Sequence, residues 1–196
     1  WASVTDEERA TIKARQGVAM PMMEDITVMD DKMEQIPMDS ATQGEIMIRG
    51  NSVMKGYYKN KEATNSAFKG GYFHSGDIAI QHSDSYIQIA DRAKDIIISG
   101  GENISSVEVE GVLMAHESVS LCAVVAMPDE KWGEVPCAFV ELLPKTVTSE
   151  DELIDFSRSK IAGFKCPKKI IFCELPKTST GKIQKFELRK VAKELS

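Results

Sequence analysis

Residues 91–105 read DRAKDIIISGGENIS, and in this stretch the chain changes from one structural pattern to another. The opening DRAKD is densely charged and lies between two apolar segments, which favours an exposed hinge over a core. The isoleucines at 96–98 predict a short strand, and the Gly100–Gly101 pair after them permits a tight turn. Ser105 with Glu108 forms the S/T-x-x-E pattern that begins a helix. The stretch therefore predicts a boundary between two domains.

Strand and helix patterns alternate downstream of the charged cluster, in an order that is typical of a compact α+β domain. We expect a three-stranded sheet flanked by helices, plus a short two-stranded hairpin. The expected strands are 96–98, 119–127, 135–143 and 170–173, and the expected helices begin at Ser105, at Ser149 and near Phe186.

Short segments with alternating apolar residues predict a strand-rich region upstream of the boundary. The expected strands are 26–28, 45–49, 72–73, 78–81 and 86–90, with a short helix at 60–69. Residues 1–24 have too little apolar periodicity to form a packed structure, so we expect partial disorder or non-native association there. The predicted domains are 1–91 and 92–196.

Composition limits the classes of function. The 196 residues are 42% hydrophobic and 28% charged, as a packed core and a solvated surface require. The net charge of −6 argues against binding nucleic acid through bulk charge, since that needs a basic excess. No run approaches the roughly 18–20 apolar residues of a membrane-spanning helix, so no transmembrane segment is predicted.

The cysteines and histidines do not form a recognisable metal motif. The four cysteines include no Cys-x-x-Cys pair, and the sequence contains no signal peptide. This pattern favours reduced thiols in a cytoplasmic protein, with a disulfide framework or a zinc site as the less favoured alternative. His74, His82 and His116 are too widely separated for metal-ligand spacing, so no metal site is predicted.

Three short motifs carry candidate chemistry, and each has a purely structural alternative. Residues 176–182 (PKTSTGK) lack the first glycine and the final Ser or Thr of a P-loop, so they form a small-residue loop that presents Lys182. That lysine either neutralises an anion or is simply solvated. Gly100–Gly101 either leaves room for a ligand or makes a tight turn. Asp77, directly after Gly76 at an expected strand start, either binds a ribose diol or caps a turn.

These motifs belong to a longer series in a fixed order. The series is GEIMIRG (44–50), GYFHSGD (71–77), DRAKDII (91–97), GGENI (100–104) with Glu108 and Glu110, WGE (132–134), and PKTSTGK (176–182) with Arg189. From about residue 11 to the end, the sequence resembles the acyl-adenylate-forming, AMP-binding enzyme family. The variants of its motifs are most similar to short- to medium-chain acyl-CoA synthetases. Ser106, where many members carry proline, and Ser85, where glycine is usual, depart from the pattern and affect only local turn geometry.

The resemblance implies a two-step reaction. A carboxylic acid and ATP form an acyl-adenylate and pyrophosphate, and the acyl group then passes to the thiol of CoA. Lys182 matches the catalytic lysine that bridges the substrate carboxylate and the α-phosphate. Asp77 matches the aspartate that holds the ribose hydroxyls of ATP, and Arg92 matches an arginine that contacts the nucleotide.

The resemblance also implies a change of conformation between the two steps. Lys94 matches the hinge residue about which the small domain rotates. This rotation withdraws Lys182 and brings Gly100 and Gly101 to the active site, where they line the tunnel for the pantetheine of CoA. A basic cluster either contacts the CoA phosphates or forms a solvated face. It consists of Lys165, Lys168 and Lys169.

By the same resemblance, region 1–91 is a strand-rich, barrel-like remnant of a large N-terminal domain, and region 92–196 is the small mobile C-terminal domain. The large domain's Ser/Thr/Gly-rich phosphate loop and its Tyr-Gly-x-Thr-Glu motif do not occur in the sequence, which begins with Trp rather than Met. We therefore expect the C-terminal portion of an ATP-dependent, short- or medium-chain fatty-acyl-CoA synthetase, an acid–thiol ligase that is inactive without the large domain. The expected cofactors are ATP, CoA and Mg²⁺, with the Mg²⁺ ligands in the large domain.

Two alternatives to this interpretation stay open. One is a family member that passes the adenylate to a carrier protein or oxidises it. The other is a non-catalytic module that pairs with a separate large subunit. The expected location is the cytoplasm. The exact acyl chain length is not predicted, because the residues that line the acyl pocket do not occur in this sequence, and the oligomeric state is also left open.

Overall fold

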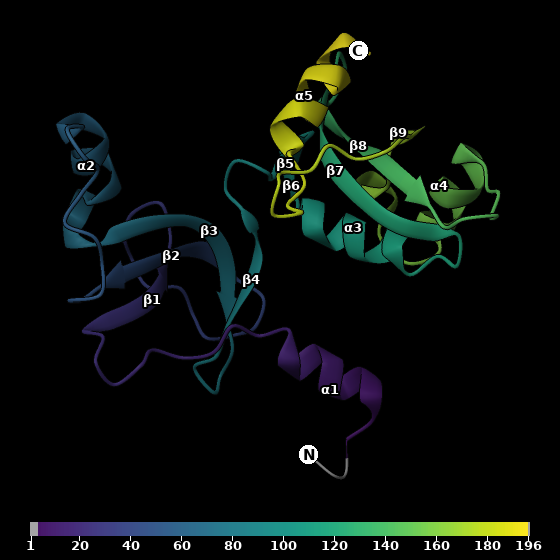
Figure 1. The fold of residues 1–196 in the computed structure, drawn as a ribbon. Coiled ribbons are helices and arrows are strands. Elements are labelled where there is room, and N and C mark those ends of the chain that lie inside the picture. The colour runs from purple at the N-terminus through teal and green to yellow at the C-terminus, as the bar shows by residue number, and fades with distance from the viewer. Residues whose placement is uncertain (1–3, 196) are drawn as a thin grey trace. The chain divides into compact units, whose positions relative to one another are not determined.

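The chain folds as two compact units. In a computed structural model that describes residues 4–195, the first unit ends at Lys94 and the second begins at Asp95 (Figure 1). The division falls inside the charged stretch that the sequence singled out.

The first unit is built on an antiparallel sheet in the order β1-β2-β3-β4. The strands are β1 (Asp25–Met29), β2 (Gln43–Arg49), β3 (Phe73–Gln81) and β4 (Ile87–Arg92), and β2 is followed by α2 (Lys61–Ala67) and a 3₁₀ turn (Lys69–Gly71). Among the described residues β1 and β4 do not pair with each other, so the sheet is open and the barrel-like form expected here is not closed.

The core of this unit lies on one face of the sheet, where alternate residues of neighbouring strands meet. Val28 of β1 is fully buried and pairs across the ladder with Ile46 of β2. Ile36, Ala79 and Ile87 complete the buried cluster. This period-two burial is what the alternating sequence predicts.

The N-terminal segment corrects one expectation. Residues 6–13, expected to lack packed structure, form helix α1 (Asp6–Lys13). The reason lies in the capping box between Thr5 and Glu8, in which each side chain accepts a hydrogen bond from the other residue's backbone. The chain then pairs with the edge of β4, because Ile87 N–H donates to the carbonyl of Gly17. Residues 1–3, which belong to the same expectation, lie outside the described residues.

The second unit contains a five-stranded sheet and confirms the predicted α+β fold. Strands β7 (Val119–Asp129), β8 (Gly133–Leu142) and β9 (Lys169–Phe172) form its three-stranded part, in which β9 runs parallel to β8. Strands β5 (Ile97–Ser99) and β6 (Glu102–Ile104) form the predicted hairpin, which joins the sheet where Ser99 pairs with Gly133.

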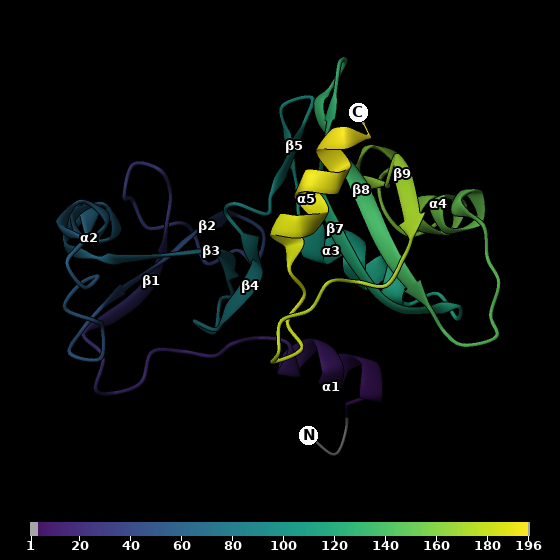
Figure 2. The same ribbon diagram turned by 45° about the horizontal axis from the view of Figure 1, so that its top comes forward.

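Helices cover both faces of this sheet (Figures 1 and 2). They are α3 (Ser106–Met114), α4 (Glu150–Arg158) and α5 (Lys185–Glu194), with a 3₁₀ turn at Gly163–Lys165. Val124 and Val140 pack against Leu113 of α3 and Leu153 of α4. Their neighbours in β7 and β8 face the other way and pack against Leu188 and Ala192 of α5. Full burial of a side chain such as Leu113 contributes about 2 kcal/mol.

The sequence-predicted caps hold these helices. Ser105 accepts a hydrogen bond from Glu108 N–H at 3.1 Å at the start of α3, and Ser149 accepts one from Glu152 N–H at 3.2 Å at the start of α4. Such caps satisfy amide groups that a helix leaves unpaired at its N-terminus.

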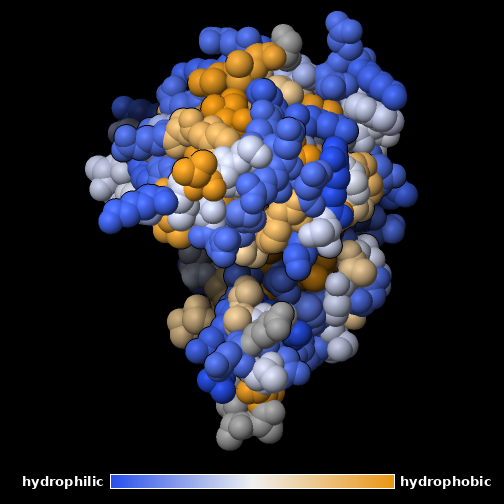
Figure 3. All heavy atoms as spheres, turned by 90° about the vertical axis from the view of Figure 1, so that its right-hand side faces the viewer, coloured by the Kyte–Doolittle hydropathy of each residue, from blue (hydrophilic) through white to orange (hydrophobic). Residues whose placement is uncertain are grey.

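The surface mixes polar and apolar side chains. Figure 3 shows hydrophobic patches among hydrophilic ones on one face of the molecule, and Phe164, Phe172 and Val147 are among the exposed apolar residues. Within residues 4–195, every helix is too short or too polar to span a bilayer.

Candidate functional site

Asp77 lies on a bulge of β3 rather than at a strand start, as the sequence had suggested. Met47 pairs with His74 and Glu45 pairs with Ile78, so residues 75–77 face a single residue of β2. Because three residues of β3 lie opposite one residue of β2, this segment bends out of the hydrogen-bonded ladder. Gly76, with φ of +74°, takes the backbone conformation that the bulge requires.

The bulge places Asp77 opposite Arg92 of β4. The two residues are cross-strand partners, and Arg92 Nε lies 3.1 Å from Asp77 Oδ1. The second carboxylate oxygen of Asp77 makes no hydrogen bond within the described residues. The side chain of Asp77 is 24% exposed, so that oxygen can accept hydrogen bonds from a ligand. A carboxylate oriented by a cation in this way fits the hydroxyl groups of a ribose.

The glycine pair forms the turn of the β5–β6 hairpin. Gly100 and Gly101 have φ of +60° and +89°, the combination found in a type I′ turn. The two positions differ in their surroundings. A Cβ on Gly100 would lie 2.8 Å from Cε3 of Trp132, whereas a Cβ on Gly101 would meet no described atom within 4 Å. A side chain at position 100 would therefore displace the Trp132 ring, whereas Gly101 presents bare backbone to the exterior.

The segment Trp132–Glu134 supports this turn. Gly100 N–H donates to the carbonyl of Trp132 at 2.8 Å, and Ile98 N–H donates to Glu134 Oε2 at 3.0 Å. From the sequence no role was expected for these residues, although they belong to the motif series. Their contacts explain why the motif accompanies a glycine pair about 30 residues away.

Lys182 lies on a tight loop between β9 and α5. Thr178 N–H donates to the carbonyl of Lys182 at 2.8 Å, and Gly181 N–H donates to the carbonyl of Thr178 at 2.9 Å. Lys182 N–H donates to Thr178 Oγ1 at 3.1 Å, so the polar backbone groups of the loop are largely satisfied within it. The side chain of Lys182 is exposed, and its ammonium makes no hydrogen bond or ion pair within residues 4–195. The loop thus offers a cation to a ligand.

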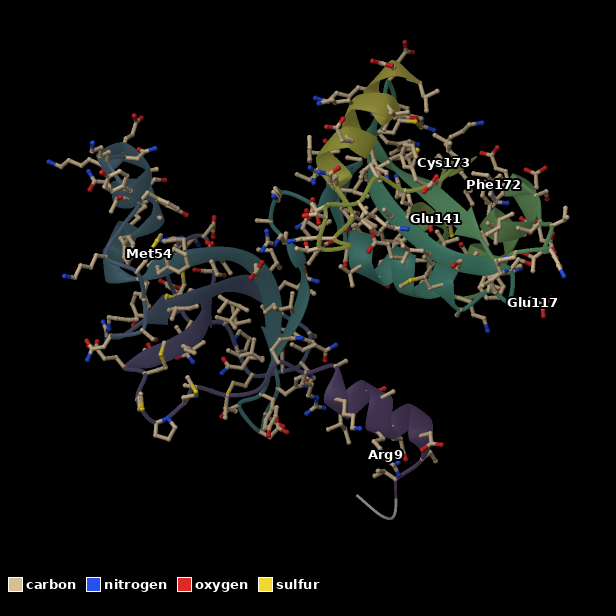
Figure 4. All side chains as sticks on the ribbon, viewed as in Figure 1. Arg9, Met54, Glu117, Glu141, Phe172 and Cys173 are labelled. Atoms are coloured by element: carbon tan, nitrogen blue, oxygen red, sulfur yellow. The ribbon has the colours of Figure 1, made fainter. Side chains whose placement is uncertain are left out.

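Glu141 of β8 anchors the chain that leads into this loop (Figure 4). It accepts a hydrogen bond from Leu175 N–H at 2.6 Å and pairs with Lys177 Nζ at 2.9 Å. The Leu175 amide, and next the Lys177 ammonium, hold the pKa of the Glu141 carboxyl below its ordinary value.

Lys185 anchors the other end of the loop, where α5 begins. Its ammonium lies 2.7 Å from Glu110 Oε1 and donates to Ser106 Oγ at 2.7 Å. The same Glu110 oxygen accepts a hydrogen bond from Val124 N–H at 2.8 Å. The sequence suggests no role for Lys185, and at Ser106 it suggests only a change of local turn geometry. The membership of Glu110 in the motif series was the one signal for this cluster.

The charged stretch at the domain boundary is not uniformly exposed, which corrects the expectation of an exposed hinge. Asp91 is only 2% exposed and accepts a hydrogen bond from Arg92 N–H at 2.7 Å. Ala93 N–H donates to the carbonyl of Gly76 in the first unit at 2.9 Å. Asp95 forms an ion pair with Arg189 of α5 in the second unit. Lys94 therefore lies between Ala93, which is hydrogen-bonded to Gly76 of the first unit, and Asp95, which is paired with Arg189 of the second unit.

The basic cluster is largely neutralised within the chain. Lys165 Nζ lies 2.8 Å from both carboxylate oxygens of Glu108, and Lys169 Nζ lies 3.3 Å from Glu150 Oε2. Lys168 is exposed. Two of the three lysines thus have carboxylate partners, which weakens the cluster as an anion site.

Three of the four cysteines, Cys122, Cys137 and Cys166, are buried, and Cys173 is half-buried. All four are unpaired, and burial raises the pKa of Cys122 and of Cys137 to about 12. Because the thiolate is the reactive form, such thiols are poor nucleophiles. Within the described residues, no group of three or more His, Cys, Asp or Glu side chains is arranged to hold a metal ion.

The predicted site residues thus occupy three places. Asp77 and Arg92 come together in the first unit. Gly100 and Gly101 share one turn in the second unit, and Lys182 lies on a separate loop of that unit.

Comparison with known proteins gives a consistent result. Residues 108–182 match the model of the AMP-binding enzyme C-terminal domain. The chain is 51% identical over 201 residues to the acetate–CoA ligase CCL3 of Humulus lupulus, covering 100% of this chain and 35% of that protein. It is 48% identical over 195 residues to the peroxisomal trans-cinnamate:CoA ligase of Petunia hybrida, covering 98% and 34%.

A solved structure agrees with these matches. The chain superposes on ATP-bound MatB from Rhodopseudomonas palustris with a TM-score of 0.87 and 31% identity, over 93% of this chain and 36% of that one. The chain thus spans about a third of the length of the proteins it matches. From the family match, these identities and the shared fold, the chain belongs to the AMP-binding enzyme family.

Proposed function

We propose that this chain acts as the C-terminal portion of an ATP-dependent acyl-CoA ligase. In the first step, a carboxylate oxygen of the acid attacks the α-phosphorus of ATP, forming acyl-AMP and releasing pyrophosphate. In the second step, the sulfur of CoA attacks the acyl carbonyl carbon and AMP leaves. One observation carries this proposal. The ammonium of Lys182 is exposed and has no partner among the described residues, whereas the backbone groups of its loop are hydrogen-bonded to one another.

Lys182 is the catalytic residue of the first step in this proposal. Negative charge accumulates around the α-phosphorus as the carboxylate attacks, and a fixed ammonium stabilises that charge more in the transition state than in the ground state. The closed hydrogen bonding of the loop supports this role, because the charge is then presented by a backbone that does not have to reorganise.

Asp77 and Arg92 bind the nucleotide in this proposal. Arg92 fixes the Asp77 carboxylate from one side, and the remaining oxygen of Asp77 accepts hydrogen bonds from the ribose hydroxyls. ATP fits these residues for that reason. Mg²⁺ would neutralise the phosphates when bound, and we assign its ligands to residues outside this chain.

Lys94 acts as the hinge between the two steps. This role is supported by its place between Ala93, which is bonded to the first unit, and Asp95, which is paired within the second. A backbone rotation at this point would move the second unit, which begins at Asp95, without breaking either anchor. Gly101 then lines the pantetheine path, for which its open surroundings leave room.

We propose a short-chain carboxylic acid, aliphatic or aromatic, as the substrate. The support is the similarity to relatives that are named for acetate and for trans-cinnamate.

The cytoplasm is our predicted location, whereas the petunia relative is named as peroxisomal. Microscopy of the tagged intact protein distinguishes the two compartments.

The test is the separation of the two half-reactions in the intact enzyme that carries this sequence. We expect acid-dependent exchange of pyrophosphate into ATP, and we expect Lys182→Ala to lower its rate by about 10²–10³-fold. Conversion of supplied acyl-AMP and CoA into acyl-CoA should stay near the parent rate. Lys190→Ala is the matched control, because Lys190 is exposed and pairs only weakly with Glu187 at 3.4 Å. Full exchange activity in Lys182→Ala would refute the proposal.

A further inference from the structure

Glu45 of β2 holds both sides of the bulge that carries Asp77. Its Oε1 accepts a hydrogen bond from Gly76 N–H at 2.7 Å, and its Oε2 lies 2.9 Å from His74 Nδ1. The Glu45 side chain is half-buried. One carboxylate therefore replaces the ladder contacts that the bulge interrupts.

His74 extends this contact to the turn before β3. Its second ring nitrogen, Nε2, lies 3.1 Å from the carbonyl oxygen of Lys69. The imidazole thus spans from Glu45 to the 3₁₀ turn at Lys69–Gly71. This contact ties the start of the bulge to that turn.

The backbone of Asp77 is constrained by the same bulge. Asp77 N–H donates to Ser75 Oγ at 3.1 Å, and the carbonyl of Gly76 accepts the hydrogen bond from Ala93. Gly76 is thus held from β2 by Glu45 and from the β4 side by Ala93. Removal of the Glu45 carboxylate would leave the segment 75–77 attached on one side only.

We propose that Glu45 is a positioning residue for nucleotide binding, because its carboxylate fixes the bulge that aims Asp77 at the ribose hydroxyls. The proposal rests on the proposed function of Asp77. Glu45 does not contact the nucleotide in this scheme and acts only through Gly76 and His74.

A general structural role and a positioning role predict different results. If Glu45 only stabilised the sheet, its loss would lower the stability and leave the preference among nucleotides unchanged. If Glu45 aims Asp77, its loss would reduce the preference for ATP over 2′-deoxy-ATP, because that preference depends on contacts to the ribose hydroxyls.

The experiment compares kcat/KM for ATP and 2′-deoxy-ATP in the intact enzyme. We expect Glu45→Ala to reduce the ATP preference by about tenfold, mainly through KM, as expected for loss of one charge-assisted contact. Glu45→Gln should retain most of the preference, because its amide oxygen can still accept from Gly76 and its N–H₂ group can donate to His74. Glu24→Ala is the matched control, since Glu24 pairs with Arg49 at the surface of the same sheet.

His74→Ala keeps the test decisive if Glu45→Ala does not fold. It removes one of the two partners of Glu45 and leaves the Gly76 contact, so we expect a smaller loss of preference, about threefold. In the 196-residue chain, hydrogen exchange at the Gly76 amide should become faster in Glu45→Ala, a readout that needs no enzymatic activity.

The variant Asp77→Ala distinguishes the proposed positioning role of Glu45 from the proposed nucleotide contact of Asp77. If it abolishes the ATP preference while Glu45→Ala and His74→Ala retain it, the positioning role of Glu45 is refuted and the function of Asp77 stands. If Asp77→Ala retains the preference, the proposed nucleotide contact itself is refuted.

Discussion

The bulge that carries Asp77 and the loop that carries Lys182 are held in place by different kinds of contact. Asp77 is held by contacts between distant segments, such as the hydrogen bond from Gly76 to Glu45, which lies 31 residues away in the sequence. The Lys182 loop is closed by hydrogen bonds among its own residues, 177–183. In the proposed function, a group that binds a ribose gains from being fixed within a sheet, whereas a charge that enters and leaves the site between the two steps gains from a self-contained loop.

At the two ends of the Lys182 loop the contacts are long-range again. Glu141 holds the entering chain, and Glu110 holds the start of α5 through Lys185. The loop is therefore a locally folded segment between two ion-paired anchors. This arrangement lets the second unit carry Lys182 as a rigid part.

The largest stability effect should come from the Glu110 anchor. Glu110→Ala removes a carboxylate whose side chain is 14% exposed. The Lys185 ammonium then loses its ion pair, and the Val124 amide loses its hydrogen-bond acceptor. We expect a loss of about 3 kcal/mol in the free energy of unfolding of the second unit. Urea unfolding followed by thiol labelling measures this unit selectively, because all four cysteines belong to it.

Glu187→Ala provides the control for that measurement. Glu187 is a helix-surface carboxylate of α5 whose partner, Lys190, lies three residues away at 3.4 Å. Its removal should change the unfolding free energy by less than about 0.5 kcal/mol. Equal losses in the two variants would show that the Glu110 contact does not anchor α5.

A smaller effect distinguishes the two glycines of the β5–β6 turn. Alanine at either position is strained by the positive φ, at a cost of about 1 kcal/mol. Gly100→Ala also forces the Trp132 ring to move, so we expect a total loss of about 2 kcal/mol. Gly101→Ala should cost only the backbone strain, and in the intact enzyme it should slow the transfer to CoA more than the adenylation. Equal stability losses in Gly100→Ala and Gly101→Ala would mean that the Trp132 ring does not restrict position 100.

The features that the sequence predicted are those set by neighbouring residues. The Ser105 cap, the glycine turn, and the order of strand and helix segments in the second unit each depend on short local patterns, and the structure contains all of them. The α+β class follows from the same local patterns.

The features that were missed depend on contacts across the fold. The bulge at 75–77 requires Glu45 from another strand, and the contact between Lys185 and Ser106 joins residues 79 positions apart. Asp91 looks solvated in a charged run, yet it is buried where β4 ends. Helix α1 is different, because its Thr5-x-x-Glu8 capping box is a local pattern that is readable from the sequence.

The smallest effect expected is a pH dependence at the Glu141 anchor. The pKa of Glu141 is lowered from 4.5 in the folded chain, so the unfolded chain takes up this proton first as the pH falls. The stabilisation is therefore complete above pH 4.5 and is lost below it, as the pH passes through the lowered pKa. Glu141→Gln should flatten this acid loss in the urea midpoint of the second unit, and Glu174→Gln, an exposed neighbour, should not. An unchanged acid profile in Glu141→Gln would mean that the Leu175 and Lys177 contacts do not hold the entry to the loop.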